Sequence, residues 1–484
     1  MIFEYPLIIV QKRQKMDRMR LTASGQAKEA SEPDKSNILL IMTDQQSSDL
    51  MSCVMGTQVL HTPHMDSLAE HGLRFTRAYT PNPLCIPARN SIFSGCHPHT
   101  TGIQSNSSKK LDIEKCPLMG SMFLAAGYDT GYFGKWHINA EKDVDKSGFQ
   151  EMAVNQGNGH DDEIATPTIE FMTRNRDKPF LAVASFSNPH DVCQLARGEK
   201  LPGGEVGEPP PPEFCPPAPF NLAEPTNETD TMSLARRSYQ ASPMFPVGTF
   251  TSDDWRQLRW GYYRLIEKVD AEIGKILTAF RASGLDKTTL IIFTSDHGDC
   301  AGAHRFNQKT VFYEESVRVP LIMSFGRHNE VSVSDLLVNI GLDILPTMLD
   351  FAGIRTPSGL KGRSLKALVS GEKAKDWRKY LVVENHITQG EPVDGMEIRI
   401  QGRMVRSCDF KYCVYDRGQD REALFDMKND IGETINLAGN PKYNRTLREH
   451  RQLLRDHAKN DNDRLVDVLL AGDVGPIPFP EENE

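Results

Sequence analysis

Residues 37–45 read Asn-Ile-Leu-Leu-Ile-Met-Thr-Asp-Gln, with five apolar residues in a row and three polar residues after them. An uninterrupted apolar run of this kind is typical of a strand that is buried on both faces of a parallel sheet. Similar runs recur at 180–184, 290–293 and 319–323, and a shorter one lies at 130–133. Helical patterns separate these runs, so the sequence predicts an α/β fold with a large, mostly parallel sheet flanked by helices.

Two long helical patterns lie between and beyond the strands. Residues 251–284 begin with Thr-Ser-Asp, which suits a helix N-cap, continue with apolar residues at helical spacing and end in glycine. A second helix is predicted from about residue 334 to residue 351, with Gly353 after it.

The C-terminal part of the chain has a different character. Short β-like segments lie at 396–400, 412–415 and 423–425, and a polar helix is predicted over 445–459. These segments predict a small antiparallel α+β subdomain over 376–484.

The remaining boundaries follow from composition. Residues 37–375 are predicted to form the catalytic domain, and residues 1–36 a tail outside the fold. Within the domain, residues 201–247 hold eleven of the thirty prolines. This insertion is interpreted either as a flexible surface segment or as a lid that contacts substrate.

The overall composition excludes several classes of protein. Acidic residues outnumber basic ones, 65 to 56, which gives a formal charge of −9 and argues against a general nucleic-acid binder. No apolar run reaches the ~18 residues that a membrane span needs. The nine cysteines include no Cys-x-x-Cys pair, so neither a disulfide scaffold nor a zinc module is indicated.

The first twenty residues do not have the pattern of a secretory signal. The apolar stretch 1–10 precedes the basic stretch 12–20, whereas a secretory signal has the reverse order and a longer apolar core. The chain as written is therefore predicted to be cytoplasmic, and periplasmic or extracellular if the true start lies elsewhere.

Four predicted strands end in polar residues. The residues that follow them are Asp44 and Gln45, Lys135 and His137, His190, and Asp296 and His297. Ligands of open α/β sheets bind outside the carboxyl ends of the strands, so these residues are expected to form one polar site.

The chemistry of these residues points to a hard metal ion and an anionic ligand. Asp44, Gln45, Asp296 and His297 offer an oxygen-rich donor set that suits Ca²⁺, Mg²⁺ or Mn²⁺ better than structural zinc. Lys135 and, further along the chain, Lys309 could face an anionic substrate.

One motif, in a Pro-rich turn before a predicted helix, indicates a protein family. Residues 85–95 contain Cys85-Ile-Pro-Ala-Arg89 and end in Ser94-Gly95. This resembles the signature of type I sulfatases, which are members of the alkaline-phosphatase superfamily. Further segments are similar to the other motifs of that family in order and spacing, at 43–45, 134–137, 188–190, 296–309, 312–320 and 424–437. The resemblance covers about 37–440 and implies an alkaline-phosphatase-like fold.

The resemblance also implies a mechanism and a partner. In the family, a separate formylglycine-generating enzyme oxidises the signature cysteine to formylglycine, whose hydrate carries two hydroxyls. One hydroxyl, bound to the metal ion, attacks sulfur. The second then loses its proton, and sulfate is expelled as the aldehyde reforms.

The roles carried over by motif divide into two groups. The catalytic group contains the nucleophile precursor Cys85, Arg89 at the diol, Lys135 and Lys309 at the sulfate oxygens, His137 as base and His190 as proton donor to the leaving oxygen. The metal group contains Asp44, Gln45, Asp296 and His297 together with the group derived from Cys85. Cations suit this reaction because a sulfate monoester is an anion and negative charge develops during attack.

Two positions depart from the pattern of many relatives. Gln45 stands where many have a second acid, and His297 stands where others have asparagine. Both variants fit family members, including some phosphonate and phosphodiester hydrolases. The expected ion is one Ca²⁺, and these two departures keep Mn²⁺ or Mg²⁺ open as alternatives.

The predicted function is hydrolysis of a sulfate monoester, with a sulfated carbohydrate as the expected substrate. A phosphonate monoester or phosphodiester hydrolase with the same formylglycine is the alternative. A binding protein without catalysis is disfavoured, because such a protein has no reason to keep every catalytic position.

Overall fold

The computed structural model describes residues 35–106, 109–154, 159–326, 331–395 and 397–471. The predicted N-terminal tail and the predictions on localisation concern residues that fall almost wholly outside these ranges, and they stay predictions. No helix in the described part of the chain combines the length and the apolar character that crossing a membrane requires.

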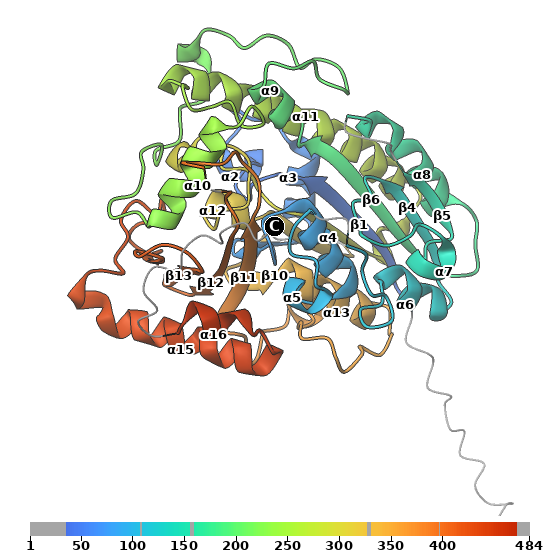
Figure 1. Cartoon of the computed structure of the whole chain (residues 1–484). Coiled ribbons are helices and arrows are strands. Elements are labelled where there is room, and N and C mark those ends of the chain that lie inside the picture. Colours follow the sequence, from blue (N-terminus) through green and yellow to red (C-terminus); the bar gives the residue numbers. More distant parts are fainter. Residues whose placement is uncertain (1–34, 107–108, 155–158, 327–330, 396, 472–484) are drawn as a thin grey trace, which may run out of the picture. The chain divides into compact units, whose positions relative to one another are not determined.

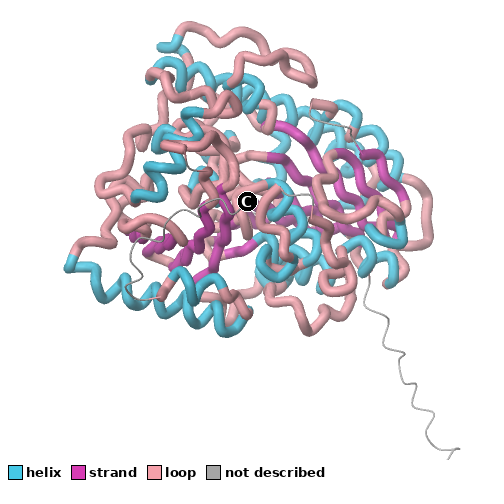
Figure 2. Tube along the Cα trace, viewed as in Figure 1, coloured by secondary structure: helices cyan, strands magenta, loops and turns pink. Residues whose placement is uncertain are grey.

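An eight-stranded sheet forms the centre of the structure (Figures 1 and 2). Its strand order is β5-β4-β6-β1-β7-β8-β2-β9, in which β5, β4, β6, β1 and β7 are mutually parallel and β8 is antiparallel to β7. The strands are β1 (Asn37–Asp44), β2 (Leu73–Phe75), β4 (Asp129–Gly134), β5 (Glu151–Val154), β6 (Phe180–Pro189), β7 (Thr289–Ser295), β8 (Leu321–Phe325) and β9 (Ser332–Ser334). The prediction of a large, mostly parallel sheet is confirmed.

Both faces of this sheet are covered by helices, which explains the uninterrupted apolar run in β1. Leu39 and Ile41 pack into one core with α3 (Pro63–Glu70), α8 (Ala165–Thr173) and α11 (Ser252–Ala282). Ile38 and Leu40 pack into the opposite core. The helices of that second core are α4 (Cys85–Ser94), α6 (Met119–Ala125) and α13 (Ile340–Phe351). Alternate residues of one strand therefore fill two different cores.

The start of α11 is fixed by the residues predicted to cap it. The Thr251 hydroxyl accepts a hydrogen bond from the Asp254 backbone N–H at 3.3 Å, and the Asp254 carboxylate accepts one from the Thr251 N–H at 2.7 Å. This reciprocal capping box satisfies two backbone donors that the helix leaves free. The predicted helix over 251–284 is confirmed.

The second predicted helix begins later than expected. Residues 332–334 form β9, and β10 (Val338–Asn339) pairs with β3 (Ala78–Tyr79). Helix α13 begins only at Ile340, because the Asn339 side chain accepts a hydrogen bond from the Gly341 N–H at 3.1 Å and so acts as its N-cap. The prediction was wrong for residues 334–339, which precede the helix.

A second, antiparallel sheet lies in the C-terminal part of the chain. Its strands, in order, are β11 (Tyr380–Ile387), β12 (Ile400–Ser407), β13 (Phe410–Tyr415) and β14 (Glu422–Asp426). Helices α15 (Asn444–Asp461) and α16 (Leu465–Leu469) pack on one face. The predicted antiparallel sheet and polar helix are confirmed. Of the predicted strand 396–400, residue 396 lies outside the described residues, and the prediction was wrong for 397–399 because pairing begins only at Ile400. The domain boundary at 375/376 stays a prediction.

The proline-rich segment is partly helical. Helix α10 (Asp230–Ala241) lies within it and buries Met232, Ala235 and Tyr239 against a core shared with the antiparallel sheet. Phe214 and Phe220, by contrast, are exposed. Part of this insertion is therefore packed against the fold.

The other helices are short. The α-helices are α2 (Ser52–Met55), α5 (Pro98–Thr101), α7 (Val144–Ser147), α9 (Val192–Ala196), α12 (Glu314–Val317) and α14 (Lys366–Val369). The 3₁₀ turns are η1 (Asp161–Glu163), η2 (Pro212–Phe214), η3 (Leu285–Lys287), η4 (Ala303–Arg305) and η5 (Pro441–Tyr443).

Candidate active site

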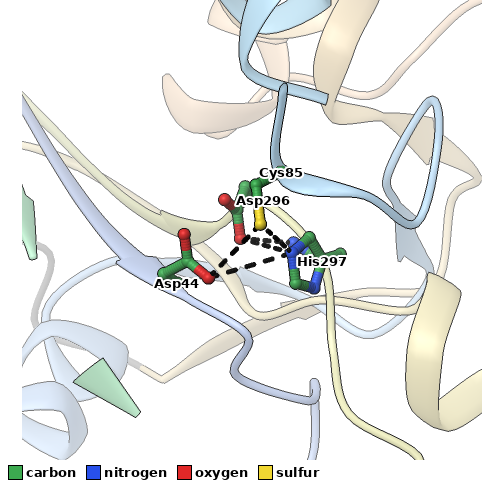
Figure 3. Close-up of side chains that lie close together, drawn as sticks. All are labelled: Asp44, Cys85, Asp296 and His297. Carbon is green, nitrogen blue, oxygen red and sulfur yellow. Dashed lines mark hydrogen bonds and ion pairs between the residues drawn. The ribbon is translucent and has the colours of Figure 1, made fainter. Parts of the chain in front are cut away.

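The two central strands deliver two carboxylates to the same edge of the sheet. Asp44 ends β1 and Asp296 follows β7 directly. The strands pair in parallel with Thr43 opposite Ser295, so the next residue on each strand is an aspartate. Figure 3 shows both carboxylates beside Cys85 and His297.

Helix α4 points its N-terminus at these carboxylates. Cys85 is its first residue, and Arg89 lies four residues later on the same face of the helix. Arg89 Nε donates to Asp296 Oδ2 at 2.8 Å, and Arg89 Nη2 donates to Asp44 Oδ2 at 3.1 Å. Since all three side chains are fully buried, this single guanidinium fixes the relative position of both carboxylates.

The donor set at the sheet edge fits a divalent cation. One ligand atom from each of Asp44, Cys85, Asp296 and His297 lies within 4.8 Å of the others. His297 Nδ1 donates to the Gly298 carbonyl at 2.9 Å, which leaves the lone pair of Nε2 for the cluster. The Cys85 thiol lies 3.2 Å from that Nε2.

The loop after β7 approaches its neighbour so closely that it needs a glycine. A Cβ on Gly298 would lie 1.9 Å from the Glu315 carbonyl oxygen, so no other residue fits without moving the backbone. This contact holds the segment that carries Asp296 and His297.

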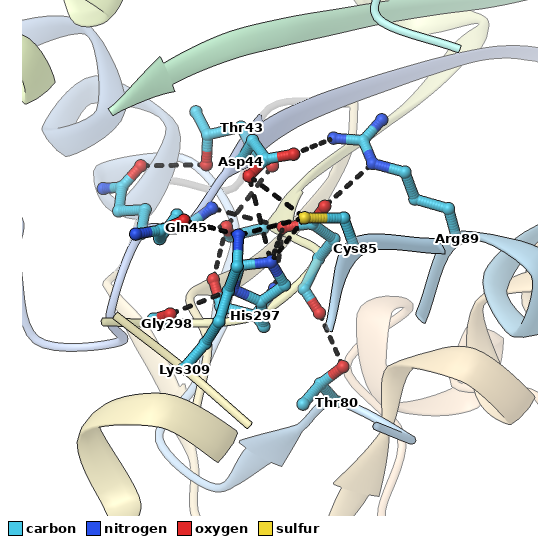
Figure 4. A network of polar contacts seen from close by, with 12 residues as sticks. Thr43, Asp44, Gln45, Thr80, Cys85, Arg89, His297, Gly298 and Lys309 are labelled. Carbon is cyan, nitrogen blue, oxygen red and sulfur yellow. Dashed lines mark hydrogen bonds and ion pairs between the residues drawn. The ribbon is translucent and has the colours of Figure 1, made fainter. Parts of the chain in front are cut away.

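Gln45 lies in the site, but its amide already has partners. Its Oε1 accepts from Lys309 Nζ at 2.6 Å, and its Nε2 donates to Asp299 Oδ2 at 2.6 Å (Figure 4). The residue adopts a left-handed backbone with φ of 71°, which turns the chain at the end of β1. Its predicted role as a metal ligand would use the second lone pair of the same oxygen, and it stays a prediction.

Two buried lysines lie against different members of the cluster. Lys309 Nζ lies 3.1 Å from the Cys85 Sγ, and Lys135 Nζ lies 2.8 Å from Asp44 Oδ2. Burial lowers the pKa of Lys309, but Cys85 and Asp44 outweigh burial and raise it above its ordinary value. Lys309 therefore stays charged in a dry site.

The electrostatic balance favours an anion at the position of Cys85. Burial and the Asp44 carboxylate raise the pKa of the Cys85 thiol, but Lys309, His297 and a hydrogen bond with His137 bring it well below its usual value. The N-terminus of α4 adds a partial positive charge at the same place.

His190 also belongs to this site. It follows β6 directly, and a hydrogen bond with Cys85 raises its pKa. Burial, Lys135 and Lys309 together outweigh this contact and lower the pKa of His190 to about 3. The six residues predicted as catalytic are thus brought together, although His137 is the exposed member.

Three supporting residues were missed by reasoning from the sequence. The Ser185 hydroxyl accepts from Arg89 Nη1 at 2.8 Å, and the Asp299 carboxylate holds the amide of Gln45. The Asp161 carboxylate accepts from the backbone N–H groups of Ser187 at 2.6 Å and Asn188 at 2.9 Å, just before His190. Asp299 lies inside a recognised motif and could have been found, whereas no sequence signal marks Asp161.

Comparisons with known proteins agree with this geometry. Residues 36–354 match the family described as Sulfatase, and residues 302–460 match the one described as N-sulphoglucosamine sulphohydrolase, C-terminal. The Delta 4,5-hexuronate-2-O-sulfatase of Bacteroides thetaiotaomicron is 31% identical over 462 residues, which cover 92% of this chain and 93% of that protein.

Solved structures show the same fold. A 2-O GAG sulfatase superposes with a TM-score of 0.76 at 29% identity and covers 89% of this chain and 93% of its own. The phosphonate monoester hydrolase of Agrobacterium radiobacter superposes with a TM-score of 0.68 at 21% identity over 92% of this chain and 100% of its own, and this likeness concerns the fold alone. The family match spans well over half of the chain, and the fold is alkaline-phosphatase-like. The chain therefore belongs to the sulfatase family and is a sulfuric ester hydrolase.

Proposed function

We propose that this enzyme hydrolyses sulfate monoesters on carbohydrates, with formylglycine at position 85 and one divalent cation, Ca²⁺ in the first instance. The observation that carries the proposal is the buried cluster of Cys85, Asp44, Asp296 and His297 with two lysines beside it. The sulfatases that the chain resembles are named for sulfated hexuronate and glycosaminoglycan substrates, which supports a sugar as the leaving group.

The proposed maturation requires a partner enzyme. An unmodified thiol is a nucleophile, but it cannot offer two hydroxyls on one carbon. When bound, the cation would lower the pKa of a hydroxyl and neutralise negative charge that develops on the sulfate oxygens. Asp44, Asp296 and His297 would hold it, and Arg89 would keep both carboxylates in place.

The chain's own cations are placed to bind the anionic group. Lys135 lies against Asp44 and Lys309 lies against Cys85, so the two ammonium groups contact different members of the cluster. We assign the sulfate oxygens to these two ammonium groups, because an ammonium in a buried site interacts with an anion more strongly than it does in water.

The two histidines are assigned to proton transfer. His190 would donate a proton to the leaving sugar oxygen, and His137 would remove one in the second step. In the free enzyme the pKa of His190 is held near 3 by burial and by Lys135 and Lys309. A sulfate anion bound between those lysines cancels part of their effect, so substrate binding itself would raise the pKa of the donor.

The experiment that tests the function compares leaving groups and anions in parallel. Enzyme co-expressed with a formylglycine-generating enzyme is assayed on defined sulfated mono- and disaccharides, on an aryl sulfate and on the matched aryl phosphonate. Turnover of at least one sulfated sugar above the phosphonate rate supports the proposal. Preference for the phosphonate with no sugar sulfate turned over would contradict it.

The His190→Ala variant is expected to separate proton donation from attack on sulfur. The loss of kcat should be roughly 10²–10⁴-fold on a sugar sulfate, because an alkoxide leaves poorly without a proton. On an aryl sulfate with a low-pKa phenol the loss should be no more than about threefold, because that leaving group needs no proton. Steady-state rates on both substrates measure this difference, and equal losses on both would rule out the assignment.

The Asp161→Asn variant is expected to show the same substrate dependence in weaker form. An asparagine offers one acceptor oxygen where two backbone N–H groups point, so the turn before His190 loses a hydrogen bond. The rate on a sugar sulfate should fall about tenfold more than the rate on an aryl sulfate. The neighbouring exposed residue provides the matched control, Asp162→Asn, which should change neither rate. A loss of thermal stability with unchanged substrate dependence would show that Asp161 only stabilises the fold.

A further inference from the structure

A second cluster of histidines and acids lies at the other end of α4. His97 follows the C-terminus of that helix, and His457 and Asp461 lie one turn apart on α15. Glu384 of β11 lies behind His97. Figure 1 shows α15 passing close to α5, and the hydrogen bond of 3.0 Å between the His99 ring and the Asp461 carbonyl joins the two helices.

The donor atoms of this cluster are spaced as ligands of one metal ion. One atom from each of His97, His457 and Asp461 lies within 4.8 Å of the others. His457 Nδ1 lies 3.0 Å from Asp461 Oδ2, and His97 Nε2 lies 3.9 Å from the same oxygen. Ligands at about 2.0–2.2 Å from a Zn²⁺ ion lie roughly 3–4 Å from one another, so the ion fits with small adjustments.

Two buried histidines of the cluster, His97 and His457, have ring nitrogens without a hydrogen bond to the described residues. The His97 side chain is 6% exposed, and its ring nitrogens lie 3.7 and 3.9 Å from carboxylate oxygens, too far for hydrogen bonds. The His457 side chain is 7% exposed, and its Nε2 is buried with no hydrogen-bond partner among the described residues. Buried polar groups are normally paired, and the His457 ring already pairs through Nδ1 with Asp461 Oδ2, so it is the two nitrogens of His97 that point to a missing ligand.

The surroundings leave one carboxylate oxygen available to that ligand. Glu384 is already bound by His99 at 2.6 Å and by Arg403 at 3.3 Å. Lys361 lies 3.6 Å from the Oδ1 of Asp461. Among the described residues, the Oδ2 of Asp461 has only His457, at 3.0 Å, and His97, at 3.9 Å, as charged neighbours.

The cluster also has access to solvent. A cavity of about 300 Å³ is lined by His97, His457 and Asp461, and it leads to the exposed side of Lys361. A water molecule from this cavity could complete the coordination shell.

We propose that His97, His457 and Asp461 bind a second divalent cation, of the Zn²⁺ class, away from the catalytic site. Imidazole ligands favour zinc over calcium, which prefers an all-oxygen shell. The ion joins the N-cap residue of α5, His97, to the C-terminal helix α15, and its role is structural.

The test uses the full-length protein after removal of metals, with the catalytic site refilled by excess Ca²⁺. Titration with Zn²⁺ alone, against a chromophoric chelator, should show one further equivalent bound. The Tm should rise by about 3 °C or more at saturation. X-ray absorption at the zinc edge should show two imidazole ligands and does not depend on any variant.

Variants distinguish this site from the catalytic one. Asp461→Asn and His457→Ala should each lower the affinity for the added Zn²⁺ by at least about tenfold. His450→Ala on the same helix is the matched control, because its ring binds the Ser407 hydroxyl at 2.9 Å instead. This control should keep the Zn²⁺-dependent rise in Tm.

Three outcomes would overturn the inference. They are a wild-type protein that binds no second equivalent, an Asp461→Asn variant with unchanged Zn²⁺ affinity, and a rise in Tm with inorganic sulfate but not with Zn²⁺. The last result would assign the cavity to an anion, since Lys361, Arg363 and Arg378 also line it. None of these outcomes depends on sulfatase activity.

Discussion

Cys85→Ala is expected to lower kcat/KM on any sulfate ester by at least about 10⁴-fold, because the methyl group of alanine cannot be oxidised to the aldehyde from which the proposed nucleophile forms. The surrounding cations would remain: Lys309 lies 3.1 Å from the Cys85 sulfur and is positioned independently by Gln45. Binding of sulfate should therefore survive the substitution while turnover does not. Inhibition by inorganic sulfate and steady-state kinetics measure the two effects separately.

The wild-type enzyme provides the complementary measurement. Mass spectrometry of the peptide that contains Cys85 should show an aldehyde, or its hydrate, in place of the thiol. Cys413→Ala is the matched control, because this cysteine is also buried but lies in β13 of the second sheet. Full activity in a preparation whose Cys85 peptide carries only thiol would refute the proposed nucleophile.

Asp296→Asn is expected to remove the catalytic cation and to reduce kcat/KM by about 10²–10⁴-fold. The substitution keeps the size of the side chain but deletes a charge that would face the cation and that already pairs with Arg89 at 2.8 Å. Asparagine is preferable to alanine here, because removal of the whole partner of a buried guanidinium costs roughly 3–5 kcal/mol of stability. Elemental analysis of the purified protein gives the metal content directly.

A second buried aspartate separates the loss of metal from the loss of stability. Asp270 of α11 accepts backbone N–H groups from His64 and Met65 and lies outside the cluster. Asp270→Asn should lower the Tm but leave the metal content and the activity per folded molecule unchanged. If Asp296→Asn still holds stoichiometric Ca²⁺, or if turnover survives chelation, the proposed ligand set is wrong.

The positions of the central site residues could be predicted from the sequence because they follow buried parallel strands. The apolar runs at 38–42 and 290–293 identify β1 and β7, and parallel pairing places Asp44 and Asp296 at one edge. Cys85 and Arg89 were instead predicted from the resemblance of residues 85–95 to the sulfatase signature. Both kinds of prediction rest on patterns that are local in the sequence.

Contacts between distant segments could not be predicted. The orientation of the Gln45 amide depends on Lys309 and Asp299, which lie more than 250 residues further along the chain. Asp161 acts on the backbone of Ser187, and no pattern links the two positions. The start of α13 was misplaced because apolar residues before Asn339 belong to short strands, whose pairing partners are also remote in sequence.

The burial of Cys85 has a consequence for the order of events during biosynthesis. Only 1% of this side chain is exposed, and it lies on the first turn of a folded helix. An oxidising enzyme cannot enclose the segment in that state, so the proposed oxidation would have to act on the chain before it folds. The time that the chain needs to fold would then limit the time available for this oxidation.

The topology of the sheet determines how slowly the chain folds. Ile38 pairs with Leu181 and with Leu290, and pairings over such long stretches of chain form slowly. A slow search for these partners extends the time in which position 85 is accessible. Conditions that accelerate folding should therefore increase the yield of folded protein while lowering the fraction that is active.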